Sequence, residues 1–114
     1  MSKIILHACT KQDWAMKSEG AYKASSLDSD KFIHCSEQET FLPVANLLWK
    51  GRNDLLLLFI DSDKVKSEIK YETDSQSGMV FPHIYGPLNL DSVIKVKELL
   101  PNSQGEFTTE AIKQ

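Results

Sequence analysis

Short apolar runs separated by polar segments divide the chain into pieces of β-strand length. Residues 4–6, in the predicted strand at residues 3–7, and residues 55–60 are continuous apolar runs, which is typical of strands buried on both faces. Residues 32–35 form a shorter apolar run, whereas residues 69–72 and 93–100 alternate apolar and polar positions, as half-buried strands do. The pattern predicts about five strands, and residues 55–60 are the strongest of them.

The first helix signal follows the first strand. Thr10, with an acidic residue three positions later, resembles a capping box and predicts a helix to about Ser18. Gly20 supplies the expected stop. We expect Trp14 and Ala15 to face inward from this helix.

The second helix signal follows the strand at residues 32–35. The sequence Ser-Glu-Gln-Glu at residues 36–39 is a complete capping box, so Ser36 is the expected N-cap of a helix that continues to residue 50. Pro43 either kinks this helix or begins its main part after one loose turn. The expected core-facing stripe consists of Val44, Ala45, Leu47 and Leu48.

The order of these elements favours an α+β fold with two or three short helices over a doubly wound α/β fold, because strands crowd the second half of the chain. Residues 21–31 and 73–78 are polar and are expected to be exposed loops. Residues 1–100 are expected to form a single domain. Residues 101–114 should be a tail that is either loosely held or folded as a short terminal helix.

Composition and charge narrow the class of partner. With 41% hydrophobic and 25% charged residues over 114 positions, the chain has the make-up of one globular domain. A net charge of −3 provides no broad basic field, so nucleic-acid binding would need a local basic patch. The longest apolar run is too short to cross a membrane. We expect a cytoplasmic protein whose two cysteines are reduced thiols.

Three histidines are the main candidates for chemistry. His7 and His34 stand at or near the ends of short predicted strands beside polar segments, a common way to place a side chain at a cleft. His83 follows Pro82 in a segment that we expect to be a loop framed by prolines. A single histidine is more often structural than catalytic, but all three lie near predicted turns. A shared ligand or active site is therefore the working hypothesis.

The same region of the sequence also contains residue types that bind metals. The zinc-binding residue types are His7, Cys9, His34, Cys35 and His83. The sequence has no Cys-x-x-Cys or His-x-x-x-His pair, and His34 and Cys35 should point to opposite faces of a strand. No metal is therefore expected. Both thiols are expected to be inert, because no local motif supplies an activating base.

Hydroxyl and aromatic side chains complete the set of candidates. Ser26 and Ser36 could bind phosphate, although the cap is the simpler role for Ser36. Tyr22 and Tyr85 could stack on a nucleobase or a nicotinamide ring. Tyr22, in a predicted loop, is the better exposed of the two.

Several motifs together resemble a known family over about residues 4–99. They are His7, Trp14, Gly20-x-Tyr22, Ser26-Leu27, Phe-Ile-His-Cys-Ser at 32–36, Val-Ala-Asn at 44–46, Asp54-Leu55, Ile60-Asp61, Tyr71-Glu72 and Phe-Pro-His-Ile-Tyr-Gly at 81–86. The family is a small bacterial one, catalogued as a domain of unknown function, number nine-five-two. The segments at 32–36 and 81–86 are its most specific motifs.

This resemblance implies a fold and a function. The family is grouped with the ADP-ribosyltransferase superfamily, whose compact split-sheet domain binds NAD in a cleft between two small sheets. The resemblance implies that His7 contacts the ribose side of NAD and that His34 supports the nicotinamide side. His83 and Tyr85 occupy the late motif in place of a glutamate pair, which disfavours protein ADP-ribosylation of the glutamate-dependent type.

The expected function is that of an NAD- or nucleotide-binding protein, with a transferase that acts on NAD through the histidine-lined cleft as the first hypothesis. A non-catalytic module that binds a nucleotide or a small metabolite is the first alternative. A protein-interaction domain with structural histidines is the second. The position of the three imidazoles distinguishes among these readings, because a site requires that they converge on one accessible cleft.

Overall fold

The computed structural model describes residues 3–17 and 20–114. The strands in these residues are β1 (Ile4–Thr10), β2 (Ala21–Tyr22), β3 (Ile33–His34), β4 (Leu55–Asp61), β5 (Glu68–Thr73), β6 (Val80–Tyr85), β7 (Leu88–Asn89) and β8 (Val93–Leu99). The α-helices are α1 (Lys11–Ala15), α2 (Ser26–Asp30) and α3 (Gln38–Leu48). Short 3₁₀ helices are η1 (Ser62–Lys64), η2 (Leu90–Ser92) and η3 (Thr109–Ile112).

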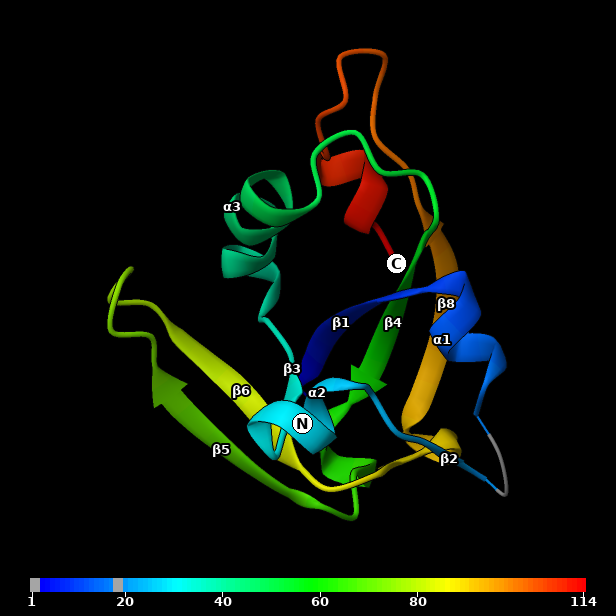
Figure 1. Cartoon of the computed structure of the whole chain (residues 1–114), viewed down its shortest axis with the longest axis vertical. Helices are drawn as coiled ribbons and strands as arrows, with labels where there is room; N and C mark the ends of the chain where they lie inside the picture. The colour runs from blue at the N-terminus through cyan, green and yellow to red at the C-terminus, as the bar shows by residue number, and fades with distance from the viewer. Residues whose placement is uncertain (1–2, 18–19) are drawn as a thin grey trace.

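Antiparallel pairing builds two three-stranded sheets and one two-stranded ribbon, in the orders β1-β4-β8, β3-β6-β5 and β2-β7. In Figure 1 the β5–β6 hairpin diverges from β1, β4 and β8, and α3 lies on the other side of the opening. The predicted α+β class is confirmed. The five predicted strands all form, and the structure adds β6 and the two short strands of the ribbon.

In the part of the chain that the structure describes, one isolated backbone bridge joins the two larger sheets. Leu6 in β1 forms an isolated antiparallel bridge with Ser36, just beyond the end of β3, through backbone hydrogen bonds of 2.7 and 2.8 Å in both directions. β1 is therefore an edge strand of its own sheet whose outer edge is partly covered by the second sheet. Both of its faces are buried, as the sequence predicts.

Alternation along the central strand β4 supplies two hydrophobic cores. Leu58 and Ile60 belong to one buried cluster, whereas Leu57 and Phe59 belong to the other, because successive side chains of a strand point to opposite faces. All four side chains are completely buried. The continuous apolar run at residues 55–60 thus contributes side chains to the core on each face of the sheet.

Helix α3 differs from its prediction in its start and in its buried face. It begins at Gln38 with Glu37 as N-cap, because the backbone of Ser36 is engaged in the bridge to β1. The core-facing residues are Phe41 and Ala45. Leu47, predicted to be buried, is 82% exposed, and Leu48 is exposed as well. The prediction was right for Ala45 and wrong for Leu47 and Leu48, because the buried arc, which also includes Phe41, lies one position later in the helical repeat than the predicted arc.

The first helix and the segment after it also need correction. Thr10 does accept a hydrogen bond from the Asp13 backbone N–H (3.0 Å), so the predicted cap is confirmed. Helix α1 ends at Ala15, which is exposed rather than inward-facing. The predicted helix end near Ser18 lies outside the described residues.

Residues 21–31 do not form an open loop. They contain β2 and α2, and the side chain of Tyr22 is only 1% exposed. The prediction of an exposed Tyr22 was therefore wrong. The polar composition of this segment predicted a loop, but Tyr22 is buried and packs in the first core cluster.

The C-terminal residues pack against the second core. Phe107 is buried in that cluster. The side-chain amide of Asn46 on α3 donates to the backbone carbonyl of Phe107 (3.0 Å), and its oxygen accepts from the backbone N–H of Phe107 (2.7 Å). η3 supplies the short terminal helix that was one of the two expectations for the tail. No helix in the described part of the chain is long and apolar enough to cross a membrane.

Candidate functional site

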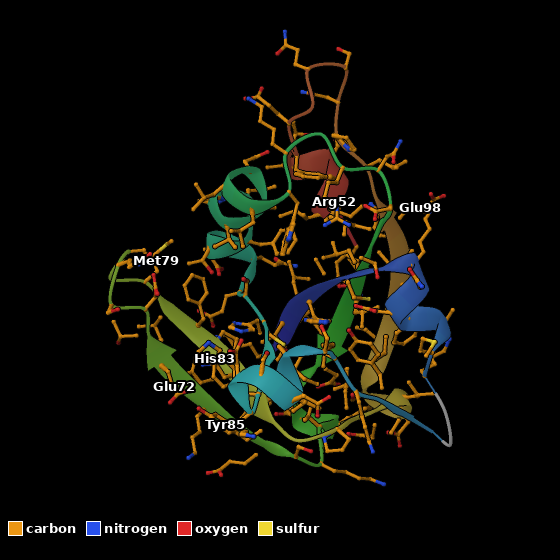
Figure 2. The ribbon with its side chains drawn as sticks, in the orientation of Figure 1. Arg52, Glu72, Met79, His83, Tyr85 and Glu98 are labelled. Carbon is orange, nitrogen blue, oxygen red and sulfur yellow. The ribbon has the colours of Figure 1, made fainter. Side chains whose placement is uncertain are left out.

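The three histidines converge on one cleft. Its volume is about 800 Å³, and its walls include His7, His34 and His83. It passes between α3 and the β5–β6 hairpin, whose tip contributes Met79 (Figure 2). Convergence on one accessible cleft is the arrangement that a ligand site requires.

His83 is not on a loop. It lies within β6, directly opposite His34 of β3, and the two imidazole centroids are 5.5 Å apart. The prediction of a proline-framed loop was wrong because Pro82 is accommodated inside the strand. The Pro82 carbonyl accepts the Cys35 N–H (3.1 Å), and Cys35 lies just past the end of β3. The N–H that proline lacks would face this same residue, so it is missing only where the pairing of β6 with β3 stops.

His7 joins β1 to this histidine pair. Its Nδ1 lies 2.6 Å from the backbone carbonyl oxygen of His34, and its Nε2 lies 3.0 Å from the hydroxyl of Tyr22. A carbonyl can only accept, so Nδ1 carries the proton and Nε2 accepts from the Tyr22 hydroxyl. Burial lowers the pKa of His7 to about 4. His7 is therefore a neutral imidazole whose two nitrogens are both engaged.

A carboxylate orients His83 from the neighbouring strand. Its Nδ1–H donates to Glu72 Oε1 of β5 (2.7 Å), which also accepts the Tyr85 hydroxyl (2.5 Å). Figure 2 shows these three side chains together on the β5–β6 hairpin. The hydrogen bonds from Tyr85 and His83 lower the pKa of Glu72. With Nδ1 as the donor, Nε2 of neutral His83 carries the lone pair that can take up a proton.

Phe32 packs against both of the opposed histidines. Its ring stacks on that of His83, with centroids 3.9 Å apart and an interplanar angle of 20°, and its centroid lies 4.6 Å from that of His34. His34 is the most open of the three, with a 57% exposed side chain whose Nε2 contacts Asp30 Oδ2 of α2 at 2.8 Å. Two imidazoles with carboxylate partners thus contact one aromatic ring.

Comparison with known proteins identifies the family. The sequence profile of the family described as "Protein of unknown function (DUF952)" matches residues 8–96, which is most of the chain. The chain belongs to this family. No curated protein matches its sequence.

Solved structures of one bacterial protein show a similar fold. The X-ray structure of protein CC0527 from Caulobacter crescentus is 27% identical in sequence and superimposes with a TM-score of 0.81, covering 93% of this chain and 94% of that one. The solution NMR structure of the same protein gives a TM-score of 0.77, also at 27% identity, over 92% of this chain and 91% of that one. The arrangement of sheets described above therefore resembles one observed by experiment.

The hydroxyl candidates of this DUF952 protein have different environments. Ser26 and Ser36 both line the cleft, and Ser36 is not a helix cap. The Ser26 Oγ is buried without a hydrogen-bond partner among the described residues. Tyr22 lines the cleft and its hydroxyl is hydrogen-bonded to His7. Tyr85 is not among the lining residues, and its hydroxyl donates to Glu72, the partner of His83.

The two thiols of the cleft are not activated. Cys9 and Cys35 are free and buried. Burial raises the pKa of Cys9 to about 11 and raises the pKa of Cys35 well above its usual range. Since the thiolate is the nucleophile, neither residue is suited to covalent catalysis near neutral pH. Among residues 3–17 and 20–114, no group of three histidine, cysteine or acidic side chains is placed to hold a metal ion.

Sequence reasoning missed the partners of the histidines. Glu72 was quoted only as part of a family motif, and Asp30 and Phe32 were given no role in the site. Glu72 and His83 are 11 positions apart and meet only because β5 and β6 pair in one register, with Glu72 opposite Phe81. An acidic residue in an alternating strand just before a histidine-containing strand is the one signal that could have indicated this contact.

Proposed function

We propose that this protein binds NAD or a related nucleotide in the three-histidine cleft and acts on it as a transferase, with His83 as the acid–base group. The observation that carries the proposal is the convergence of His34 and His83 beside Phe32 in one cleft. A volume of about 800 Å³ lies within the range of about 300–1,000 Å³ that small-molecule and cofactor sites occupy.

The hydrogen bonds favour different roles for the three histidines. Glu72 fixes the ring of His83 and leaves Nε2 to accept a proton, which is the arrangement of a general base held by a carboxylate. His34 is exposed enough to contact a ligand directly. His7, neutral and engaged at both nitrogens, positions the backbone of His34 instead of contacting the ribose.

The proposed step is the transfer of the ADP-ribosyl group. The glycosidic bond between nicotinamide and the ribose breaks, and nicotinamide leaves as a neutral molecule with the bonding electrons. An acceptor hydroxyl or amine forms the new bond at the same carbon, and His83 takes up the proton that the acceptor loses. The buried thiols take no part in this route.

Two assays test the proposal. Calorimetry with NAD, ADP-ribose and nicotinamide measures binding, and release of nicotinamide from NAD measures turnover. We expect His83→Gln to slow release by about a hundredfold or more, the usual contribution of a general base, while NAD still binds. His34→Ala should weaken binding itself. No detectable binding at millimolar ligand would rule the proposal out.

A matched pair of glutamate variants distinguishes an effect on the site from the effect of removing any exposed carboxylate. Glu72→Gln removes the carboxylate that holds His83, and we expect it to lower the rate of release by about tenfold with little change in KM. Glu98→Gln removes an exposed carboxylate of β8 that pairs with Lys11 at 2.7 Å and lies far from the hairpin in Figure 2. Equal losses in the two variants would contradict the role given to Glu72.

A binding module without turnover is the second candidate. The buried, engaged state of His7 and the raised thiol pKa values favour it, because they leave few reactive groups in the cleft. This reading predicts that NAD binds but that no nicotinamide is released over hours. His83→Gln would then change affinity alone.

A further inference from the structure

The charges on the cleft walls are unusual for a site that binds a dinucleotide. The formally charged side chains that line it, within the part of the chain that the structure describes, are Asp13 and Asp74, and both are acidic. Neither lysine nor arginine is among these lining residues. A phosphate bound in this cleft would lie near carboxylates and not near cations. The negative charges would repel each other.

Asp74 is held in its charged form. Its Oδ2 accepts both the Ser77 hydroxyl (2.7 Å) and the Ser77 N–H (2.9 Å) in the turn between β5 and β6. These hydrogen bonds, that of the hydroxyl above all, lower the pKa of Asp74. The carboxylate therefore contributes a negative charge to the cleft wall throughout the neutral range.

Lysines near this region are engaged elsewhere. The Lys70 ammonium lies over the ring of Tyr85, 4.7 Å from its centroid, behind the Glu72–His83 pair. The Lys17 ammonium lies over the ring of Trp14 at 4.4 Å. Both side chains are absent from the lining described above.

The remaining walls suit a flat ring. Phe32 and His83 already form one stacked pair at a centroid distance of 3.9 Å, so an aromatic surface is exposed to whatever enters beside them. Phe41, Trp49 and Phe81 line other parts of the cleft. Aromatic faces carry partial negative charge and attract cationic or neutral heterocycles.

We propose that the cleft recognises the uncharged or cationic nucleoside part of its ligand and leaves the phosphate groups in solvent. The inference rests on the proposed function and specifies which part of an NAD-type molecule supplies the binding energy. It follows that an unphosphorylated nucleoside is as good a ligand as its nucleotide. The structure assigns the discrimination to Asp74 and Asp13 on the walls, and to the aromatic rings between them.

Calorimetry on two matched ligand pairs tests this. Adenosine is compared with AMP, and nicotinamide riboside with nicotinamide mononucleotide, at about pH 8, where free imidazole is neutral. We expect the phosphate to weaken binding or to leave Kd within about threefold, with little salt dependence for the nucleosides. Tightening by more than about threefold in both pairs would overturn the inference and leave the proposed function standing. Failure of all four ligands to bind would overturn both.

Charge removal at Asp74 supplies the second arm. Asp74→Asn keeps an oxygen to accept from Ser77, and we expect it to tighten AMP by about threefold while adenosine is unchanged. Asp54→Asn is the control, since Asp54 pairs with Arg52 at an exposed position outside the cleft lining. An identical response of the two variants, or no response of AMP to Asp74→Asn, would contradict the placement of the charge.

Discussion

Acid should destabilise this protein through His7, and the structure fixes the direction and the size of the effect. His7 is 6% exposed, and burial lowers its pKa to about 4 in the folded state. In the unfolded chain an imidazole titrates near pH 6.5. The unfolded state therefore binds more protons than the folded state between these values, so stability must fall as the pH is lowered through this window.

The magnitude follows from the two pKa values. Full protonation costs about 3 kcal/mol, the free energy that corresponds to the fall in the pKa of this imidazole from 6.5 to about 4. At about pH 5 the loss is about 2 kcal/mol, because the unfolded imidazole is almost fully charged there and the folded one is not. Above about pH 7 both states are neutral at this residue, and its contribution no longer changes.

Urea denaturation of the wild type and of His7→Gln measures this. Glutamine retains a donor and an acceptor but does not titrate, and the carboxyl groups contribute alike to both proteins. We expect the difference in unfolding free energy between them to shrink by about 2 kcal/mol from about pH 7.5 to about pH 5. A difference that stays constant with pH, or an NMR titration of His7 near pH 6.5, would refute the assignment of a neutral, buried imidazole.

Three further predictions concern the scaffold around the cleft. Phe107→Ala should lower the unfolding free energy by about 3–5 kcal/mol in denaturation experiments, because the tail residue fills the second core; a loss below about 1 kcal/mol would contradict that packing. Gly86→Ala should destabilise by about 1–3 kcal/mol, since its φ of +152° disfavours a side chain and the new Cβ would lie 2.5 Å from the Ser67 Oγ. Cys9 and Cys35 should react with an aromatic disulfide reagent at least about tenfold more slowly in the folded protein than in urea, measured by absorbance, because both thiols are buried. Rapid reaction of either thiol in the folded state would contradict its burial.

The strands of this fold were predictable because apolar periodicity reports burial directly. Residues 55–60 contain no polar side chain. This is typical of a strand that is covered on both faces, as β4 is. Helix α3 shows the limit of the method. Its apolar residues surround most of the helix, so their order could not decide that Phe41 faces inward and Leu47 outward. That choice is made by the sheet against which the helix packs.

The composition of the candidate site was harder to predict than its existence. The three histidines stand out by residue type, but their spacing depends on strand register, which the sequence does not encode locally. His34 and His83 are directly opposed only because β3 and β6 pair in one register. The pairing of β5 with β6 brings Glu72 diagonally to His83. Pro82 misled the prediction, since a proline is expected to end a strand unless its missing N–H falls where pairing has ceased.

The backbone bridge between Leu6 and Ser36, which joins the two sheets, accounts for the role of His7. In an antiparallel ladder that continued past the bridge of Leu6 with Ser36, the N–H of Ala8 would donate to the carbonyl of His34. The sheets diverge there, and the Nδ1–H of His7 donates to that carbonyl instead. The imidazole thus replaces a backbone donor at the point where the cleft opens, and its loss would leave a carbonyl unpaired at a cost of about 1–3 kcal/mol. In the proposed function, His7 would therefore act on a ligand through the position of β3. Its substitution should then alter affinity, whereas that of His83 should alter the rate of the proton transfer.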